Sequence, residues 1–165
     1  MAFRTVRRFG DPVLRMAAEP ITVFDQRLRT IVADLLDTVD APGHAGVAAP
    51  QIGVGVRAFS YRVDGEIGYV LNPEVVELSD EVQDDVEACL SLPGLGFETR
   101  RAQHAVVRGV EVDNEPITVS GGGLMARCLQ HETDHLDGVV YIQRLDPERR
   151  REAYHQVREQ DWFWQ

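Results

Sequence analysis

The chain has 165 residues, a length typical of one domain, so we expect a single domain over residues 1–165. Its 17 basic and 27 acidic residues give a net charge of −10, which disfavours DNA, other nucleic acids and anionic membranes as general partners. All the basic residues are arginine, so chemistry that needs a lysine amine, such as Schiff-base catalysis or a phosphate-loop lysine, is excluded.

The first element predicted along the chain is a helix over 26–40. Asp25 is a suitable N-cap, apolar residues recur at helical spacing from Leu28 to Val39, and Pro42-Gly43 ends the pattern. Between residues 53 and 120 the apolar runs are short and rich in β-branched residues, which predicts mostly antiparallel strands. The predicted strands cover 56–61, 68–71, 75–78, 105–112 and 117–119, with turns at Asn72-Pro73 and Asp113-Asn114.

Helical periodicity returns after the three glycines at 121–123, which we interpret as a flexible turn. It runs from Leu124 to Leu136, and a further helix is predicted from Pro147 to about Gln160. Helices at the two ends with strands between them indicate an α+β fold.

The cellular compartment is predicted from what the sequence lacks. No apolar run approaches the length of a membrane span, and no apolar stretch follows the arginines of the first ten residues. We therefore expect neither a membrane segment nor a signal peptide. Cys89 and Cys128 are then expected to be free thiols in a cytoplasmic protein.

The residues from His131 to His135, His-Glu-Thr-Asp-His, are the sharpest chemical feature. Residues four apart lie on one face of a helix, so the two imidazoles can bind one metal ion, with Glu132 beside it. That arrangement is typical of hydrolytic metal sites. The alternative is a solvated helix with surface histidines. Asp134 is expected to point to solvent or to orient one of the histidines.

A catalytic metal usually takes three protein ligands and keeps one position for water, so a third ligand is needed. Cys128 shares the helical stripe but lies about 7 Å along the axis from the metal position, which favours a buried apolar role for it. Three downstream glutamates could serve, as in one class of zinc peptidases, but they lie among arginines and resemble helix ion pairs. They are Glu148, Glu152 and Glu159. Cys89 is the remaining candidate.

Three motifs and their order resemble those of peptide deformylase. They are residues 46–53 (Gly-Val-Ala-Ala-Pro-Gln-Ile-Gly), 87–91 (Glu-Ala-Cys-Leu-Ser) and 131–135. The resemblance also includes 10–15 (Gly-Asp-Pro-Val-Leu-Arg) and extends to about Arg144. Three motifs together are far more specific than the histidine pair alone.

The resemblance implies antiparallel sheets packed around a central metal-binding helix, with an N-terminal and a C-terminal helix. It implies Cys89, His131 and His135 as metal ligands and Glu132 as the catalytic acid and base. It also implies Gln51 and the Leu90 backbone N–H as oxyanion donors, and Gly46, Val47 and Leu92 as substrate-binding residues.

The implied reaction removes the formyl group from N-formylmethionyl nascent peptides and releases formate in the bacterial cytoplasm. The resemblance suggests Fe²⁺ as the native metal, with Zn²⁺, Ni²⁺ or Co²⁺ able to replace it. A transient ribosome contact by the C-terminal helix is a further hypothesis. The aromatic residues at 162–164 could equally pack back on the body of the protein.

Two positions depart from the family pattern, which generally has glycine where this chain has His44 and Ala88. These changes bear on the shape of the substrate entrance, and Ala88 would be strained if its φ had to be positive. The arginines at 100–101 and 149–151 are expected to be solvated. The competing interpretations are a small zinc peptidase, and a protein whose metal site is structural or whose catalysis is lost.

Overall fold

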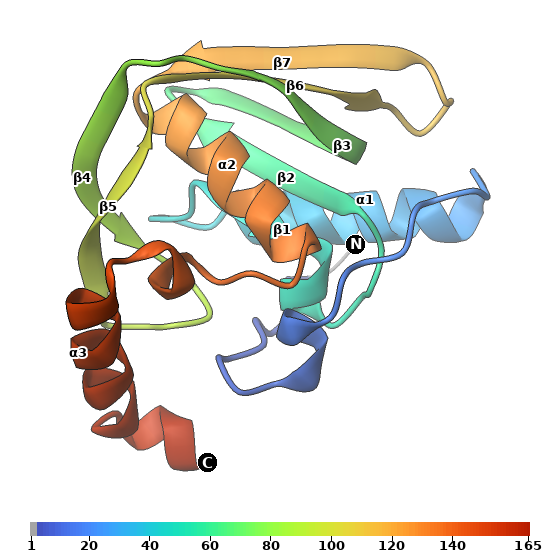
Figure 1. The fold of residues 1–165 in the computed structure, drawn as a ribbon. Helices are drawn as coiled ribbons and strands as arrows, with labels where there is room; N and C mark the ends of the chain where they lie inside the picture. Colours follow the sequence, from blue (N-terminus) through green and yellow to red (C-terminus); the bar gives the residue numbers. More distant parts are fainter. Residues whose placement is uncertain (1–2) are drawn as a thin grey trace.

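A computed structural model describes residues 3–165, so residues 1–2 of the expected domain lie outside the described residues. Five strands form one antiparallel sheet in the order β1 (Gly46–Ala48), β2 (Ala58–Val63), β3 (Glu66–Leu78), β6 (His104–Val110) and β7 (Pro116–Gly122). Two more strands, β4 (Val82–Ala88) and β5 (Gly96–Ala102), form a separate antiparallel ribbon. Together with the three α-helices of residues 3–165, these sheets confirm the α+β class (Figure 1).

The first helix, α1 (Gln26–Val39), matches the prediction to within one residue. The Asp25 carboxylate accepts the Leu28 N–H at 3.0 Å and satisfies one of the unpaired amides of the first turn. The apolar stripe of α1 packs against one face of the five-stranded sheet, in a cluster that includes Val47 and Leu71.

The helix α2 (Leu124–Leu136) covers the opposite face of the sheet. Strand residues alternate between the two faces, so Ala48 and Phe59 contact the α2 cluster whereas their neighbours Val47 and Ala58 contact the α1 cluster. Figure 1 shows α2 between the sheet and the β4–β5 ribbon. This central position buries most of the helix, including His131 and His135.

The predicted turn at Asn72-Pro73 is wrong, because β3 continues through it as one strand. Asn72 has a left-handed φ of 48°, and the pairing of β3 with β6 shifts register beside it. The Asn72 side chain donates to the carbonyl of Ile21 and accepts from its N–H, at 2.9 and 2.8 Å. A residue typical of turns therefore makes a bulge that fixes the N-terminal segment.

Two further differences concern β4, β5 and the glycines. The ribbon was not predicted, because its strands carry polar residues on both faces and lack the β-branched runs that the other strands show. Gly121 and Gly122 belong to β7 and do not form the expected flexible turn. Gly123, with φ 57°, is the N-cap residue that precedes α2. The turn at Asp113-Asn114 is confirmed, with φ 61° at Asn114.

The C-terminal helix, α3 (Pro147–Arg158), follows the short 3₁₀ helix η3 (Tyr141–Arg144). After α3 the chain turns back, and the indole N–H of Trp162 donates to the Pro93 carbonyl at 3.0 Å. Trp162 therefore contacts the loop after Cys89, whereas Trp164 is exposed. None of the helices formed by residues 3–165 combines the length and apolar character that crossing a membrane requires.

Candidate active site and metal centre

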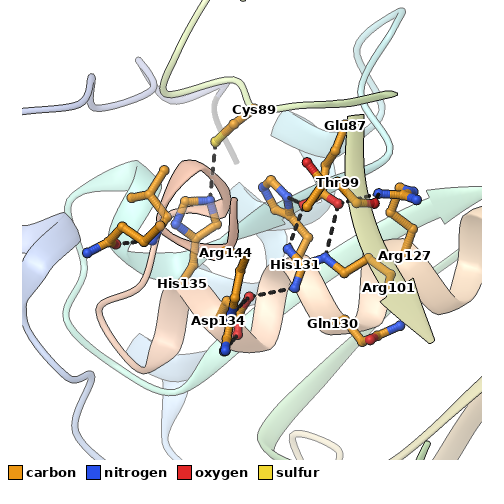
Figure 2. Close-up of polar contacts among 12 residues, drawn as sticks. Glu87, Cys89, Thr99, Arg101, Arg127, Gln130, His131, Asp134, His135 and Arg144 are labelled. Atoms are coloured by element: carbon orange, nitrogen blue, oxygen red, sulfur yellow. Dashed lines mark hydrogen bonds and ion pairs between the residues drawn. The ribbon is translucent and has the colours of Figure 1, made fainter. Parts of the chain in front are cut away.

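Cys89, His131 and His135 come together in the interior (Figure 2). One donor atom from each lies within 4.8 Å of the other two, and all three side chains are buried. The Cys89 Sγ is 3.3 Å from the His135 Nε2. One thiol and two imidazoles at this spacing fit a tetrahedral metal ion with one position left open. The structure therefore brings together the three residues expected as ligands.

Two elements supply these donors. His131 and His135 are one turn apart on α2, and their ring centroids are 4.9 Å apart. Cys89 directly follows β4, where the ribbon lies against the helix. The centre therefore depends on how the ribbon is held against α2.

His131 is oriented by Glu87, to which sequence reasoning assigned no role. The His131 Nδ1 lies 2.6 Å from the Glu87 Oε1, so Nδ1 carries the hydrogen and Nε2 is free to bind a metal. The sequence signal for this role is the spacing of Glu87 and Cys89. Residues two apart share one face of an extended segment, so Glu87 lies on the same face as the expected ligand. Burial alone would raise the pKa of Glu87, but hydrogen bonds and charges from His131 and Arg101 outweigh it and hold that pKa well below its usual range.

Glu132 lies beside the ligands with its carboxylate buried. Its Oε2 has no hydrogen-bond partner among the described residues, so it is available to water or substrate. Burial raises the pKa of Glu132 to about 7, with the charge of His131 acting in the opposite direction. A carboxyl group with this pKa can take up and return a proton at neutral pH.

The Gln51 amide points its donor end at the centre. Its Oε1 accepts the Ala48 N–H at 2.8 Å, which fixes the side chain, and its Nε2 lies 3.7 Å from Cys89 Sγ and 3.2 Å from Ser91 Oγ. Gln51 belongs to the 3₁₀ helix η2 (Ala49–Ile52), which follows β1 directly. The Gly46–Gly53 motif thus places an amide donor next to the expected ligands.

A cavity of about 400 Å³ opens onto these groups. Gly46, Leu90 and Leu92 line it together with Gln51 and Glu132. Val47 does not reach the cavity, because its side chain packs on the α1 face of the sheet. A larger depression of about 980 Å³ between β5 and α3 is lined mostly by charged side chains and contains none of the three candidate ligands.

The other ligand candidates lie elsewhere. Cys128 is buried with its Sγ 3.3 Å from the Ala45 carbonyl, and it is not part of the three-donor group. Burial raises the pKa of its thiol, as expected for an apolar role. The three downstream glutamates are exposed on or just after α3. The residues that a zinc peptidase would need as a third ligand are therefore at the surface.

The expectations for Asp134 and Arg101 are wrong. Asp134 is buried and contacts no histidine in the described hydrogen bonds; it binds Arg101 at 2.7 Å and Arg144 at 2.5 Å. Arg101 is also buried, whereas its neighbour Arg100 is exposed and pairs with Asp84 at 3.0 Å. In the sequence, Asp134 and Arg101 resemble a solvated face. In the structure, they lie in the interior and support the site.

The two departures from the family pattern have different settings. His44 is half-buried and bonds through Nδ1 to the Thr38 carbonyl at 2.7 Å, and it lines a neighbouring groove instead of the cavity. Ala88 lines the cavity as the last residue of β4. Its φ is not positive, so alanine is accommodated there without backbone strain.

The central helix of this α+β fold carries two histidines and a carboxylate beside a buried cysteine. This combination defines the class of protein as a metal-dependent hydrolase. Residues 3–151 match the family described as polypeptide deformylase. The chain belongs to this family, and the expected membership and hydrolase activity are confirmed.

Similar proteins cover almost the whole chain. The peptide deformylase of Acidothermus cellulolyticus is 54% identical, with 100% of this chain and 91% of the relative aligned. That of Parafrankia sp. is 48% identical over 98% of this chain and 89% of the relative. The crystal structure of a peptide deformylase from Legionella pneumophila superposes with a TM-score of 0.88 at 34% identity, covering 96% of this chain and 95% of that one.

Proposed function

We propose that this chain removes the formyl group from N-formylmethionyl nascent peptides and releases formate at the cavity between β1, α2 and the end of β4. The observation that carries the proposal is the buried Cys89, His131 and His135 group, next to which the Glu132 Oε2 has no hydrogen-bond partner among the described residues. A structural metal site is closed by four protein ligands, whereas three ligands beside a cavity leave room for a reacting group.

The residues present fit one divalent metal ion. A thiolate and two imidazoles suit Fe²⁺, Zn²⁺, Co²⁺ and Ni²⁺, and the hydrogen bond from His131 to Glu87 sets the tautomer that a ligand requires. When bound, such an ion polarises a carbonyl group and lowers the pKa of water to about 7. We propose Fe²⁺ as the native ion, with the other three able to replace it.

Glu132 is the proposed proton carrier. Its carboxylate accepts a proton as water attacks the formyl carbon, and then returns it to the amine of the leaving peptide. The raised pKa of about 7 suits both transfers at neutral pH. The burial of the carboxylate keeps bulk water from competing for the proton.

Gln51 and the Leu90 backbone N–H are the proposed donors to the oxyanion that forms on the formyl oxygen. The Gln51 amide is already held by Ala48, so it needs little reorganisation when the charge develops. A positioned donor of this kind contributes about 3 to 4 kcal/mol to transition-state stabilisation. Apolar cavity residues such as Leu92 and Leu95 suit a methionine side chain.

The decisive experiment measures formate release from formyl-Met-Ala by anaerobically purified, metal-loaded protein. We expect formate and free Met-Ala in equal amounts, and slower hydrolysis of acetyl-Met-Ala, whose larger acyl group must fit the same site. Cleavage between methionine and alanine would instead indicate a peptidase. Protein with one metal ion per chain and no formate release would show that the site is structural.

The native metal is tested separately from the reaction. If Fe²⁺ is bound to the Cys89 thiolate, exposure to air should inactivate the enzyme by oxidising metal or sulfur, and Ni²⁺ or Co²⁺ should restore a lasting activity. A preparation that contains zinc alone and keeps a high rate in air would contradict the iron assignment.

The proposed setting is the bacterial cytoplasm, where formylated chains are made, with a transient contact between α3 and the ribosome. Arg151 and Arg158 on α3 are exposed and are the support for this contact. The double variant Arg151→Glu/Arg158→Glu should co-sediment less with ribosomes than the parent, whereas Arg27→Glu on α1 should not differ. Equal co-sedimentation of all three proteins would contradict the contact.

A further inference from the structure

The side chain of Arg127 is buried next to the proposed metal centre, one helical turn before His131 on α2. Its Nη1 donates to the Glu87 Oε2 at 2.6 Å and to the Thr99 carbonyl at 2.8 Å, and its Nη2 lies 3.4 Å from the Gln83 Oε1. Figure 2 shows Glu87 enclosed by His131, Arg101 and Arg127. A buried guanidinium with these partners is fixed in place.

The Glu87 carboxylate has two donors on each oxygen. Oε1 accepts from His131 Nδ1 and Arg101 Nη2, both at 2.6 Å. Oε2 accepts from Arg101 Nε at 3.0 Å and from Arg127 Nη1. Both arginines therefore set the plane of the Glu87 carboxylate. They also set the direction from which its Oε1 faces His131.

The two arginines are not equivalent. Arg101 is shared, because its Nη1 also forms an ion pair with Asp134, and Asp134 in turn pairs with Arg144. Arg127 pairs with Glu87 alone among the ion pairs of residues 3–165. Without Arg127, the carboxylate would depend on a guanidinium that a second carboxylate also attracts.

Arg127 also joins the two elements that supply the ligands. It lies on α2 with the two imidazoles, and its partners lie on β4 and β5, the ribbon that leads to Cys89. Glu87 itself is two residues before Cys89. A contact at this point holds the thiolate side and the imidazole side of the centre at a fixed separation.

We propose that Arg127 is a positioning residue for the metal centre, which acts through Glu87 to hold His131 in its ligand orientation and the ribbon against α2. This role rests on the metal centre proposed above. Partners of metal ligands outside the coordination sphere typically change metal affinity by about 10- to 100-fold when removed. The effect should therefore appear in metal binding, before any substrate is added.

The test uses full-length protein loaded anaerobically with Co²⁺, whose visible spectrum reports the ligand geometry. The rate of Co²⁺ loss to an excess of chelator is measured for the parent, Arg127→Met, Glu87→Gln, the double variant and the control Arg100→Met. We expect Co²⁺ loss about 10 to 100 times faster in Arg127→Met and Glu87→Gln, with altered spectra. Arg100 is exposed on the same strand as Arg101, so its variant should match the parent within about twofold.

The double variant separates positioning from packing. If Arg127 acts through Glu87, the effect of Arg127→Met should largely disappear in the Glu87→Gln background. Rates that multiply independently, or an Arg127→Met rate equal to that of the parent, would overturn the proposal. If Arg127→Met does not fold by circular dichroism, Arg127→Lys takes its place, with intermediate acceleration expected and an unchanged rate overturning the role. A parent that takes up no Co²⁺ would instead overturn the metal centre itself.

Discussion

Gly46 and Glu132 are in direct contact, and a β-carbon built on Gly46 would overlap the Glu132 carboxylate, with Cδ only 2.7 Å away. Gly46 begins β1, and the proposed proton carrier is on α2, so the backbone of the sheet edge forms one wall around it. The contact limits the positions that the carboxylate can adopt. Glu132 also lines the cavity.

Gly46→Ala should therefore displace Glu132 and slow deformylation by about 10²-fold, because small displacements of a catalytic group have effects of this size. The metal content should be unchanged, since the three atoms nearest to a Cβ on Gly46 all belong to Glu132 and none to a candidate ligand. Gly55→Ala is the matched control, because a Cβ there meets nothing within 4 Å. Steady-state rates and metal analysis of the two variants check this, and equal rates would mean that the contact is catalytically irrelevant.

Glu132→Ala should retain metal and fold but lose about 10² to 10⁴ in kcat, the usual contribution of a positioned general base. The carboxylate lies beside the donor group without completing it, so the loss should not reach metal binding. Glu152→Ala, at an exposed position on α3, serves as the control and tests the zinc peptidase alternative. Activity of Glu132→Ala within about tenfold of the parent would place the proton carrier elsewhere.

Gln51→Ala should lower kcat by about 10²- to 10³-fold through the missing oxyanion donor, with metal intact. The variant also leaves the buried Ala48 N–H without its partner, so a small loss in the free energy of unfolding should accompany it. Kinetics with metal analysis distinguish the two effects, and exposed Gln26 provides a neutral glutamine-to-alanine control. A Gln51→Ala variant that loses its metal would show a ligand-supporting role instead.

Cys89→Ala should lose most of its metal, because two imidazoles and water bind far more weakly than the full set. Cys128→Ala should keep its metal and lose about 1 to 3 kcal/mol of unfolding free energy through the cavity it creates. Metal content and chemical denaturation of both variants provide the comparison. Similar metal loss in the two would refute the choice of Cys89.

The candidate site was predictable because its members lie in short contiguous motifs. The spacing of His131 and His135 implies one helix face, and the helix in the structure has that face turned toward Cys89. The role of Glu87 and its arginines was not predictable in the same way. A buried arginine and a solvated one look alike in a sequence, and only tertiary pairing distinguishes Arg101 from Arg100.

The missed elements of the fold have a similar cause. Strand β4 has polar residues at most positions, and its one buried residue is Glu87, so it lacks the apolar alternation that marks a half-buried strand. Asn72-Pro73 has the composition of a turn, but the Asn72 amide is committed to Ile21, far away in sequence. Local patterns cannot report such long-range partners.

The division of the donors between the β4–β5 ribbon and α2 has a consequence for stability. An ion shared by Cys89 and His135 would cross-link positions 46 residues apart, closing a loop that includes the whole of β5, β6 and β7. The unfolded chain has no such preformed site, so metal binding and folding are thermodynamically linked. A free metal concentration one hundred times the dissociation constant would add about 2.7 kcal/mol to the free energy of unfolding. The melting temperature of this protein would then rise with metal occupancy, and chelators would weaken the attachment of the ribbon first.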